Sequence, residues 1–83
     1  MEAKSIEVEV KDVVLGLIGK VFDIEEEKID LEEELAYSLG ADSTEMVELL
    51  VLINTHLGTN LKPAEINTFQ TPRQIVRIIE SRV

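Results

Sequence analysis

The stretch that decides the fold is residues 39–58, LGADSTEMVELLVLINTHLG, because it holds both ends of a helix and the apolar pattern between them. Asp42 suits the N-cap position, and Glu45 follows three residues later, at the spacing of a capping box. The apolar run closes at Gly58, a residue type that commonly ends helices in the left-handed conformation. The stretch therefore predicts a helix over residues 43–57.

This predicted helix has an inner and an outer face. At about 100° per residue, the apolar residues within about 60° of Met46 form a core stripe. They are Leu49, Leu50, Ile53 and Leu57. The outer face combines small contact residues with acidic ones, namely Thr44, Val47 and Val51 with Glu45 and Glu48. Such a face is typical of a transient partner interface. The alternative is that Val47 and Val51 touch the long loop or flanking helices.

Apolar residues at helical spacing also predict a first helix over residues 4–21. Its opening, residues 5–10, alternates with period two, so a short strand is the competing interpretation. Gly16 and Gly19 each cost a helix interior up to about 1 kcal/mol. The length of the segment favours a helix.

Residues 22–41 form acidic clusters between single apolar residues such as Leu35, which predicts a long loop pinned to the core.

Residues 62–67 leave room for only a short third helix. Thr71 and Pro72 then repeat the helix-start signal for a last helix that ends near Arg82.

The expected fold class is therefore all-α. It is a small four-helix bundle, with three main helices and a short third one, and a long acidic loop joins helices one and two. We expect a single domain over residues 1–83.

The chain of 83 residues carries a formal net charge of −9, which is unevenly distributed. Between Asp23 and Glu48, eleven acidic residues stand against Lys28 alone, a balance of −10, and the remaining residues sum to +1. This field repels nucleic acid and anionic membrane surfaces, so we expect partners with basic docking patches.

Several function classes are excluded. No apolar run approaches the roughly 20 residues of a membrane span, so no membrane insertion is expected. The N-terminus has no basic start followed by an apolar stretch, and we expect a cytoplasmic location. The chain is too small to enclose an active site, so we expect a monomeric non-enzyme without catalytic residues. There is no cysteine, and thus no protein thiolate.

The acidic loop raises the question of a metal site. Asp23, Glu25, Glu27 and Glu34 stand at positions 1, 3, 5 and 12 of an EF-hand-like register. Lys28 occupies the position where a glycine makes the sharp turn. We therefore expect a solvated acidic loop without a specific metal site. A weak, nonspecific site for divalent cations is the alternative.

Ser43 stands in the first turn of the central helix. It is either a second capping hydroxyl or a modification site, because free N–H groups and the helix dipole favour an attached phosphate there. The only histidine, His56, lies about 20 Å further along the helix and about 220° around it. It cannot be the base for Ser43, which excludes a serine hydrolase.

The LGADS sequence at residues 39–43, followed by MVEL at 46–49 and a glycine after the helix, resembles the signature of the acyl carrier protein family. In that family a D-S-L motif after L-G-A opens helix two. The resemblance extends over nearly the whole chain in length, acidity and helix order. It implies that Ser43, next to Asp42 in the motif, carries 4′-phosphopantetheine through a phosphodiester. A Mg-dependent phosphopantetheinyl transferase would add this arm from coenzyme A. The arm brings its own thiol, which fits the missing cysteine.

The resemblance also implies a function. The chain would carry acyl intermediates as thioesters and present them to acyl-loading and synthase enzymes in fatty-acid, polyketide or specialised lipid biosynthesis. Partners would contact Thr44, Glu45, Val47, Glu48 and Val51. Leu61 and Ile66 are the candidates for the mouth of an acyl cavity between helices two and three.

Departures from the family pattern point to a specialised rather than a housekeeping member. Thr44 stands where the family usually has leucine, and Arg73 and Arg77 make the last helix basic. The alternatives are a small acidic helical adaptor that docks on a basic partner without modification, and a peptidyl or aminoacyl carrier.

Overall fold

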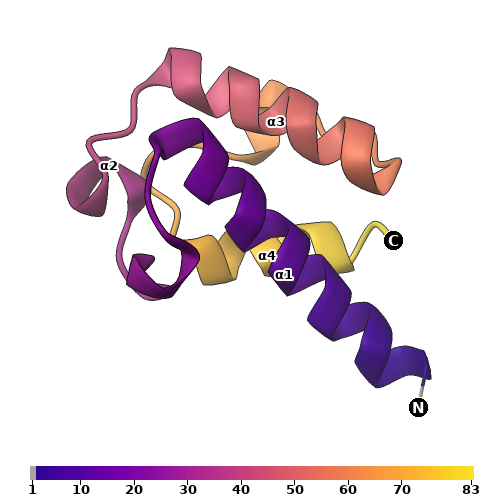
Figure 1. The fold of residues 1–83 in the computed structure, drawn as a ribbon. Helices are drawn as coiled ribbons and strands as arrows, with labels where there is room; N and C mark the ends of the chain where they lie inside the picture. Colours follow the sequence, from indigo (N-terminus) through magenta and orange to yellow (C-terminus); the bar gives the residue numbers. More distant parts are fainter. Residues whose placement is uncertain (1) are drawn as a thin grey trace.

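The computed structural model describes the backbone of residues 2–83 and the side chains of residues 10–83. Three longer helices dominate the fold (Figure 1): α1 (Glu2–Phe22), α3 (Ser43–Leu57) and α4 (Pro72–Glu80). The connections hold the short helix α2 (Leu35–Ser38) and the 3₁₀ turns η1 (Glu26–Lys28) and η2 (Pro63–Glu65). The described residues contain no strand, which confirms the all-α fold. The strand interpretation of residues 5–10 is wrong, because α1 already begins at Glu2.

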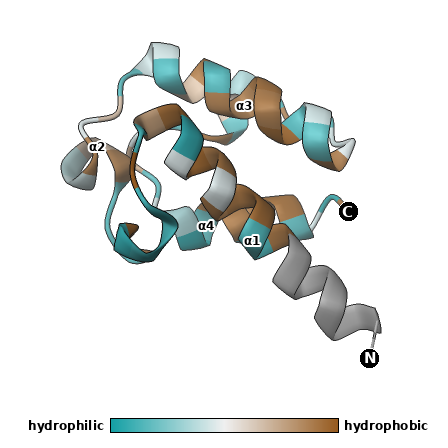
Figure 2. Cartoon of the chain, in the orientation of Figure 1, coloured by the Kyte–Doolittle hydropathy of each residue, from teal (hydrophilic) through white to brown (hydrophobic). Residues whose placement is uncertain are grey.

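The core lies where α1 packs against α3 and α4. From α1 it takes Val10, Val14, Leu17 and Ile18, and from α3 Met46, Leu49, Leu50 and Ile53. Leu57, the last member of the expected stripe of α3, is partly buried and packs against this core. Ile18 is fully buried. In Figure 2, hydrophobic residues recur between hydrophilic ones along α3, as an amphipathic helix requires. Burial of one stripe per helix thus holds the bundle together.

The ends of α3 lie where the sequence predicts them. The Asp42 carboxylate accepts a hydrogen bond from the Glu45 amide at 2.9 Å, and the Glu45 carboxylate accepts one from the Asp42 amide at 3.1 Å. At the other end Gly58 adopts the left-handed conformation with φ 68°. The helix therefore begins at Ser43 and ends at Leu57 because both termini are satisfied locally.

The start of α4 is also closed by a capping box, formed by Thr71 and Gln74. The Thr71 hydroxyl accepts from the Gln74 amide at 3.1 Å, and the Gln74 side chain accepts from the Thr71 amide at 2.9 Å. The helix ends at Glu80, two residues before the predicted end at Arg82.

The expected short helix over residues 62–67 is present as the three-residue 3₁₀ helix η2. The chain becomes extended at Ile66, with φ −127° and ψ 145°, and the Ile66 side chain is buried. Extended backbone at this point is incompatible with a longer helix. The fourth helix of the bundle is α2, inside the segment that was expected to be a plain loop.

The turn after α1 explains one of its glycines. Asp23 has φ 56°, and the Ile24 amide donates to the Gly19 carbonyl at 3.0 Å, which closes the helix in a Schellman-type turn. A Cβ on Gly19 would lie 2.7 Å from the Ile24 carbonyl oxygen. Gly19 is therefore needed for close approach of the backbone.

We expect Gly19→Ala to lower the free energy of unfolding by about 1–2 kcal/mol, because the clash with a backbone carbonyl outweighs the gain in helix propensity. Gly16→Ala is the matched control, since its Cβ would meet only the flexible Glu26 carboxylate at 3.4 Å. That variant should raise the free energy of unfolding by up to about 1 kcal/mol. Urea denaturation of both variants checks this, and equal effects would contradict the close approach.

Residues 31–36 run beside residues 68–73. The Leu35 amide donates to the Gln70 carbonyl at 3.1 Å, the Ala36 amide to the Thr68 carbonyl at 2.8 Å, and the Arg73 amide to the Leu31 carbonyl at 3.2 Å. The Leu35 side chain is fully buried, as its predicted pinning role requires. These contacts bring α2 next to the segment between η2 and α4.

The length and hydropathy of the helices also bear on membranes. Within residues 2–83, none of the helices combines the length and the apolar character that a membrane span needs.

Candidate functional site

Ser43 is the first residue of α3, and its side chain is exposed. Asp42 already caps the helix, so a second capping hydroxyl is not needed at this end. The amides of Ser43 and Thr44 have no partner within the helix, because the first N–H groups of any helix lack one. They lie at the positive end of the helix dipole, where a phosphate group is favoured. The geometry thus presents a hydroxyl that an external enzyme can reach.

A pocket of about 240 Å³ opens beside this serine. It lies between α3 and the segment that contains η2, and its lining residues are Ser43, Met46, Val47, Leu50, Pro63, Ile66, Asn67 and Thr68. Five of these eight residues are apolar, so the pocket can accept an apolar chain attached close to Ser43.

The predicted partner residues of α3 lie together on its outer face. Val47 is 52% exposed and Val51 is 56% exposed, and Thr44 and Glu48 are exposed beside them. Glu45 is half-buried, because its carboxylate turns back into the capping box. The loop and the flanking helices therefore do not cover Val47 and Val51, although Val47 also lines the pocket opposite the segment that contains η2.

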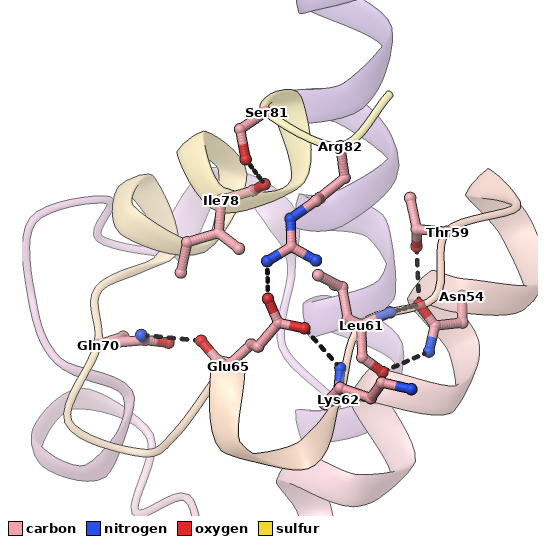
Figure 3. A network of polar contacts seen from close by, with 9 residues as sticks. All are labelled: Asn54, Thr59, Leu61, Lys62, Glu65, Gln70, Ile78, Ser81 and Arg82. Carbon is pink, nitrogen blue, oxygen red and sulfur yellow. Dashed lines mark hydrogen bonds and ion pairs between the residues drawn. The ribbon is translucent and has the colours of Figure 1, made fainter.

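Of the two residues expected at the mouth of the acyl cavity, Leu61 and Ile66, one lines the pocket and the other does not. Ile66 is buried and lines the pocket, whereas Leu61 is buried but does not line it. The expectation for Leu61 needs correction, and Figure 3 shows the reason: the Asn54 side chain accepts from the Leu61 amide at 2.9 Å and donates to its carbonyl at 3.1 Å. These bonds fix Leu61 next to Asn54, three helical turns from Ser43.

The same polar network positions the pocket wall. Glu65 pairs with Arg82 and accepts from the Lys62 amide at 2.8 Å, while the Gln70 side chain donates to the Glu65 carbonyl at 3.2 Å (Figure 3). These contacts hold η2 against the end of α4. Residues 66–68 follow directly and form one side of the pocket. Sequence reasoning missed Asn67 and Thr68, because nothing in the local pattern shows that they return to the start of α3.

His56 lies near the opposite end of α3 from Ser43, as the helical spacing requires. Its ring nitrogen Nδ1 lies 2.9 Å from the Leu52 carbonyl oxygen. A catalytic pair of Ser43 and His56 is therefore excluded.

The segment with the EF-hand-like register contains a helical turn. The turn η1 takes up residues 26–28, in the middle of the EF-hand-like register. Among the residues that the structure describes, no group of three or more His, Asp or Glu side chains is placed to hold a metal ion. Glu32 pairs with Arg73 and Glu25 with Lys28, so part of the loop's charge is balanced within the chain.

The fold and this site together define a small helical carrier domain, in which an exposed serine at a capped helix start adjoins an apolar pocket. Comparisons with known proteins agree. The family model described as phosphopantetheine attachment site matches residues 12–79. The acyl carrier protein of Treponema pallidum (strain Nichols) is 31% identical over 68 residues, which are 82% of this chain and 87% of the relative.

Two further relatives carry the same name. The acyl carrier protein of Treponema denticola is 30% identical over 66 residues, 80% of this chain and 85% of the relative. The acyl carrier protein of Coprothermobacter proteolyticus is 28% identical over 83 residues, 100% of this chain and 96% of the relative. The chain belongs to the acyl carrier protein family.

The protein is thus an acyl carrier that bears covalently attached 4′-phosphopantetheine. This finding decides against the unmodified adaptor. The described residues fit such a group, since an exposed serine hydroxyl at a helix N-terminus borders a mainly apolar pocket.

Proposed function

We propose that Ser43 is the attachment residue for 4′-phosphopantetheine. The observation that carries this proposal is that the exposed Ser43 both begins α3 and lines the pocket. Two other serines with described side chains lie elsewhere and use their hydroxyls locally. Ser38 donates to the Glu34 carbonyl at 3.1 Å, and Ser81 donates to the Ile78 carbonyl at 2.6 Å.

Attachment is a phosphoryl transfer. The Ser43 hydroxyl oxygen forms a bond to the phosphorus next to the pantetheine part of coenzyme A. The bond from that phosphorus to the adenosine 3′,5′-bisphosphate portion breaks, and the hydroxyl proton leaves to a base of the transferase. Once attached, the arm supplies a thiol that forms acyl thioesters.

The residues around Ser43 support this chemistry from the protein side. The capping box of Asp42 and Glu45 fixes the first turn of α3, and with it the backbone that carries the Ser43 hydroxyl. The helix dipole stabilises the phosphodiester by about 0.3–1 kcal/mol at an exposed site. Met46, Leu50 and Ile66 line the pocket and can shelter an apolar chain.

We further propose that partner enzymes dock basic patches on the outer face of α3. Glu48 is exposed there next to Val47 and Val51, so carboxylates can steer association while small apolar contacts allow rapid release. The partners are the transferase and the acyl-loading and synthase enzymes of fatty-acid, polyketide or specialised lipid biosynthesis. Thr44 in place of the family's leucine supports a specialised member. The monomeric state and the cytoplasmic location stay predictions.

The experiment that tests the attachment is mass spectrometry of the protein after incubation with coenzyme A, Mg²⁺ and a broad-specificity phosphopantetheinyl transferase. We expect the mass gain of one phosphopantetheine, and fragmentation of the peptide should place it on Ser43. A mass gain on another residue would refute the proposal. The proposal would also fail if neither the broad-specificity transferase, under conditions that modify a control carrier, nor a dedicated transferase produced a mass gain.

We expect Glu48→Lys to lower the rate constant of modification by the transferase roughly threefold to tenfold at low salt, because a steering charge is reversed on the docking face. Glu27→Lys is the matched control: it makes the same change in net charge at an exposed position in η1. The defect of Glu48→Lys should shrink as salt rises, since the Debye length falls from about 10 Å at 0.1 M to about 3 Å at 1 M. Equal defects in both variants would contradict a specific docking face.

A further inference from the structure

Two aromatic side chains project into solvent although the fold has an apolar core. Tyr37 in α2 is 80% exposed, and Phe69 between η2 and α4 is 71% exposed. The chain has only three aromatic residues, so most of its aromatic surface is displayed rather than buried. Single exposed apolar residues are common, but aromatic residues in neighbouring segments are a feature of interfaces.

The backbone holds these two residues in adjacent segments. The Ala36 amide, next to Tyr37, donates to the carbonyl of Thr68, next to Phe69, at 2.8 Å. Leu35 is fully buried, and Tyr37 follows two residues later, about 200° around the helix, which points its ring outward. The exposure of Tyr37 is therefore fixed by the anchoring of α2.

Phe69 is held in place by its own turn. The Asn67 side chain accepts from the Phe69 amide at 2.9 Å, and the Gln70 side chain accepts from the Asn67 amide at 3.0 Å. The Gln70 amide side chain also donates to the Glu65 carbonyl at 3.2 Å. These bonds order the backbone that carries the ring, so less backbone entropy is lost when a partner binds there.

We call the two exposed residues Tyr37 and Phe69 the aromatic patch, and the segment that carries Phe69 adjoins the pocket. Thr68 lines the pocket together with Ser43, and it is the direct neighbour of Phe69. In Figure 1, α2 lies at the end of the molecule where α3 begins. A partner that reaches Ser43 can therefore cover the aromatic patch as well.

The charge around the patch selects the chemistry of the partner. Glu34 immediately precedes α2 and is exposed, and Asp42 and Glu48 are exposed on the side of α3. Nucleic acids and anionic lipid surfaces are repelled by this field. An arginine side chain suits both the exposed rings and the carboxylates, because its guanidinium stacks on aromatic faces and pairs with carboxylates.

We propose that the Tyr37 and Phe69 patch is a second docking surface of the carrier, on which a partner enzyme places arginine side chains while α3 engages its basic patch. The inference rests on the proposed function, because the partner is an enzyme that works on the group at Ser43. It adds a contact site outside α3 and names arginine, rather than any cation, as the group recognised there.

The test is an NMR titration of the ¹⁵N-labelled protein with a hexa-arginine peptide and with a hexa-lysine peptide of equal charge. The acidic face attracts both peptides, and arginine also pairs bidentately with carboxylates. Stacking on the rings is therefore reported by the part of the arginine preference that is lost when the rings are removed. We expect the arginine peptide to bind about twofold to fivefold more tightly for each ring that takes part. The amide signals of residues 36–38 and 68–70 should shift most.

The double variant Tyr37→Ser, Phe69→Ser should lose most of the arginine preference, whereas Tyr37→Phe, which keeps the ring, should retain it. Val83→Ser is the control for loss of an exposed apolar side chain elsewhere, since Val83 is 56% exposed. Equal binding of both peptides to the wild-type protein would overturn the inference, as would a preference that is undiminished in the double variant. Ring-dependent binding to phosphatidylcholine vesicles would overturn it in favour of a lipid surface.

The peptide titration does not need the prosthetic arm, so the two proposals can fail separately. A protein that gains phosphopantetheine on Ser43 but shows no arginine preference overturns the aromatic docking surface alone. A protein that shows the preference but is modified elsewhere overturns the assignment of Ser43 alone.

Discussion

Replacing Ser43 by alanine is expected to abolish incorporation of phosphopantetheine completely. The transfer needs a hydroxyl oxygen at the start of α3, and alanine offers none. The adjacent Thr44 hydroxyl lies about 100° further around the helix, away from the position that the transferase reaches. Intact-mass measurement after incubation with coenzyme A, Mg²⁺ and transferase should show only the unmodified species.

The loss must come from the missing hydroxyl and not from unfolding. Ser43 is exposed and the cap of α3 is made by Asp42, so Ser43→Ala should change the free energy of unfolding by less than about 0.5 kcal/mol. Ser38→Ala is the matched control, because it removes another exposed serine hydroxyl close by in the sequence. It should be modified as fast as the wild-type protein. An arm on Ser43→Ala, or none on Ser38→Ala, would contradict the assignment.

The sequence was most informative where structure is determined locally. The bounds of α3 and the start of α4 are correct because capping boxes and a C-terminal glycine act within a few residues. The placement of Ser43 at the start of α3 follows from the same local signals. The exposure of Val47 and Val51 could only be left open, because it depends on where the long loop passes.

Long-range contacts account for what the sequence did not show. The helix α2 is a single turn, and it is fixed by bonds to residues 68 and 70, more than 30 positions away in the chain. The pocket lining at Asn67 and Thr68 has the same origin. Leu61 and Ile66 look equivalent as apolar residues after α3, yet the side chain of Asn54 fixes the first away from the pocket. The aromatic patch likewise exists only because two distant segments meet.

The short helix α2 in the long loop bonds to Thr68, which lines the pocket, and Leu35 anchors α2 in the core. We therefore expect a large loss of stability when Leu35 is changed. Leu35→Ala removes a fully buried side chain of the core and should lower the free energy of unfolding by about 2–5 kcal/mol. For a domain of this size, a loss of about 3 kcal/mol lowers Tm by roughly 12–24 °C. Urea and thermal denaturation, followed by circular dichroism, measure both quantities.

The matched control is Tyr37→Ala in the same helix, two residues away, where the side chain is 80% exposed and the cost should stay within about 0.5 kcal/mol. The two variants differ in burial and share their local backbone, so the contrast isolates the anchoring of α2. Hydrogen exchange at the amides of Leu35 and Ala36, which bond to the Gln70 and Thr68 carbonyls, should speed up strongly in Leu35→Ala and little in Tyr37→Ala. Equal costs in the two variants would mean that α2 is not anchored through Leu35, and the loop would then lose its role in holding the pocket wall beside Ser43.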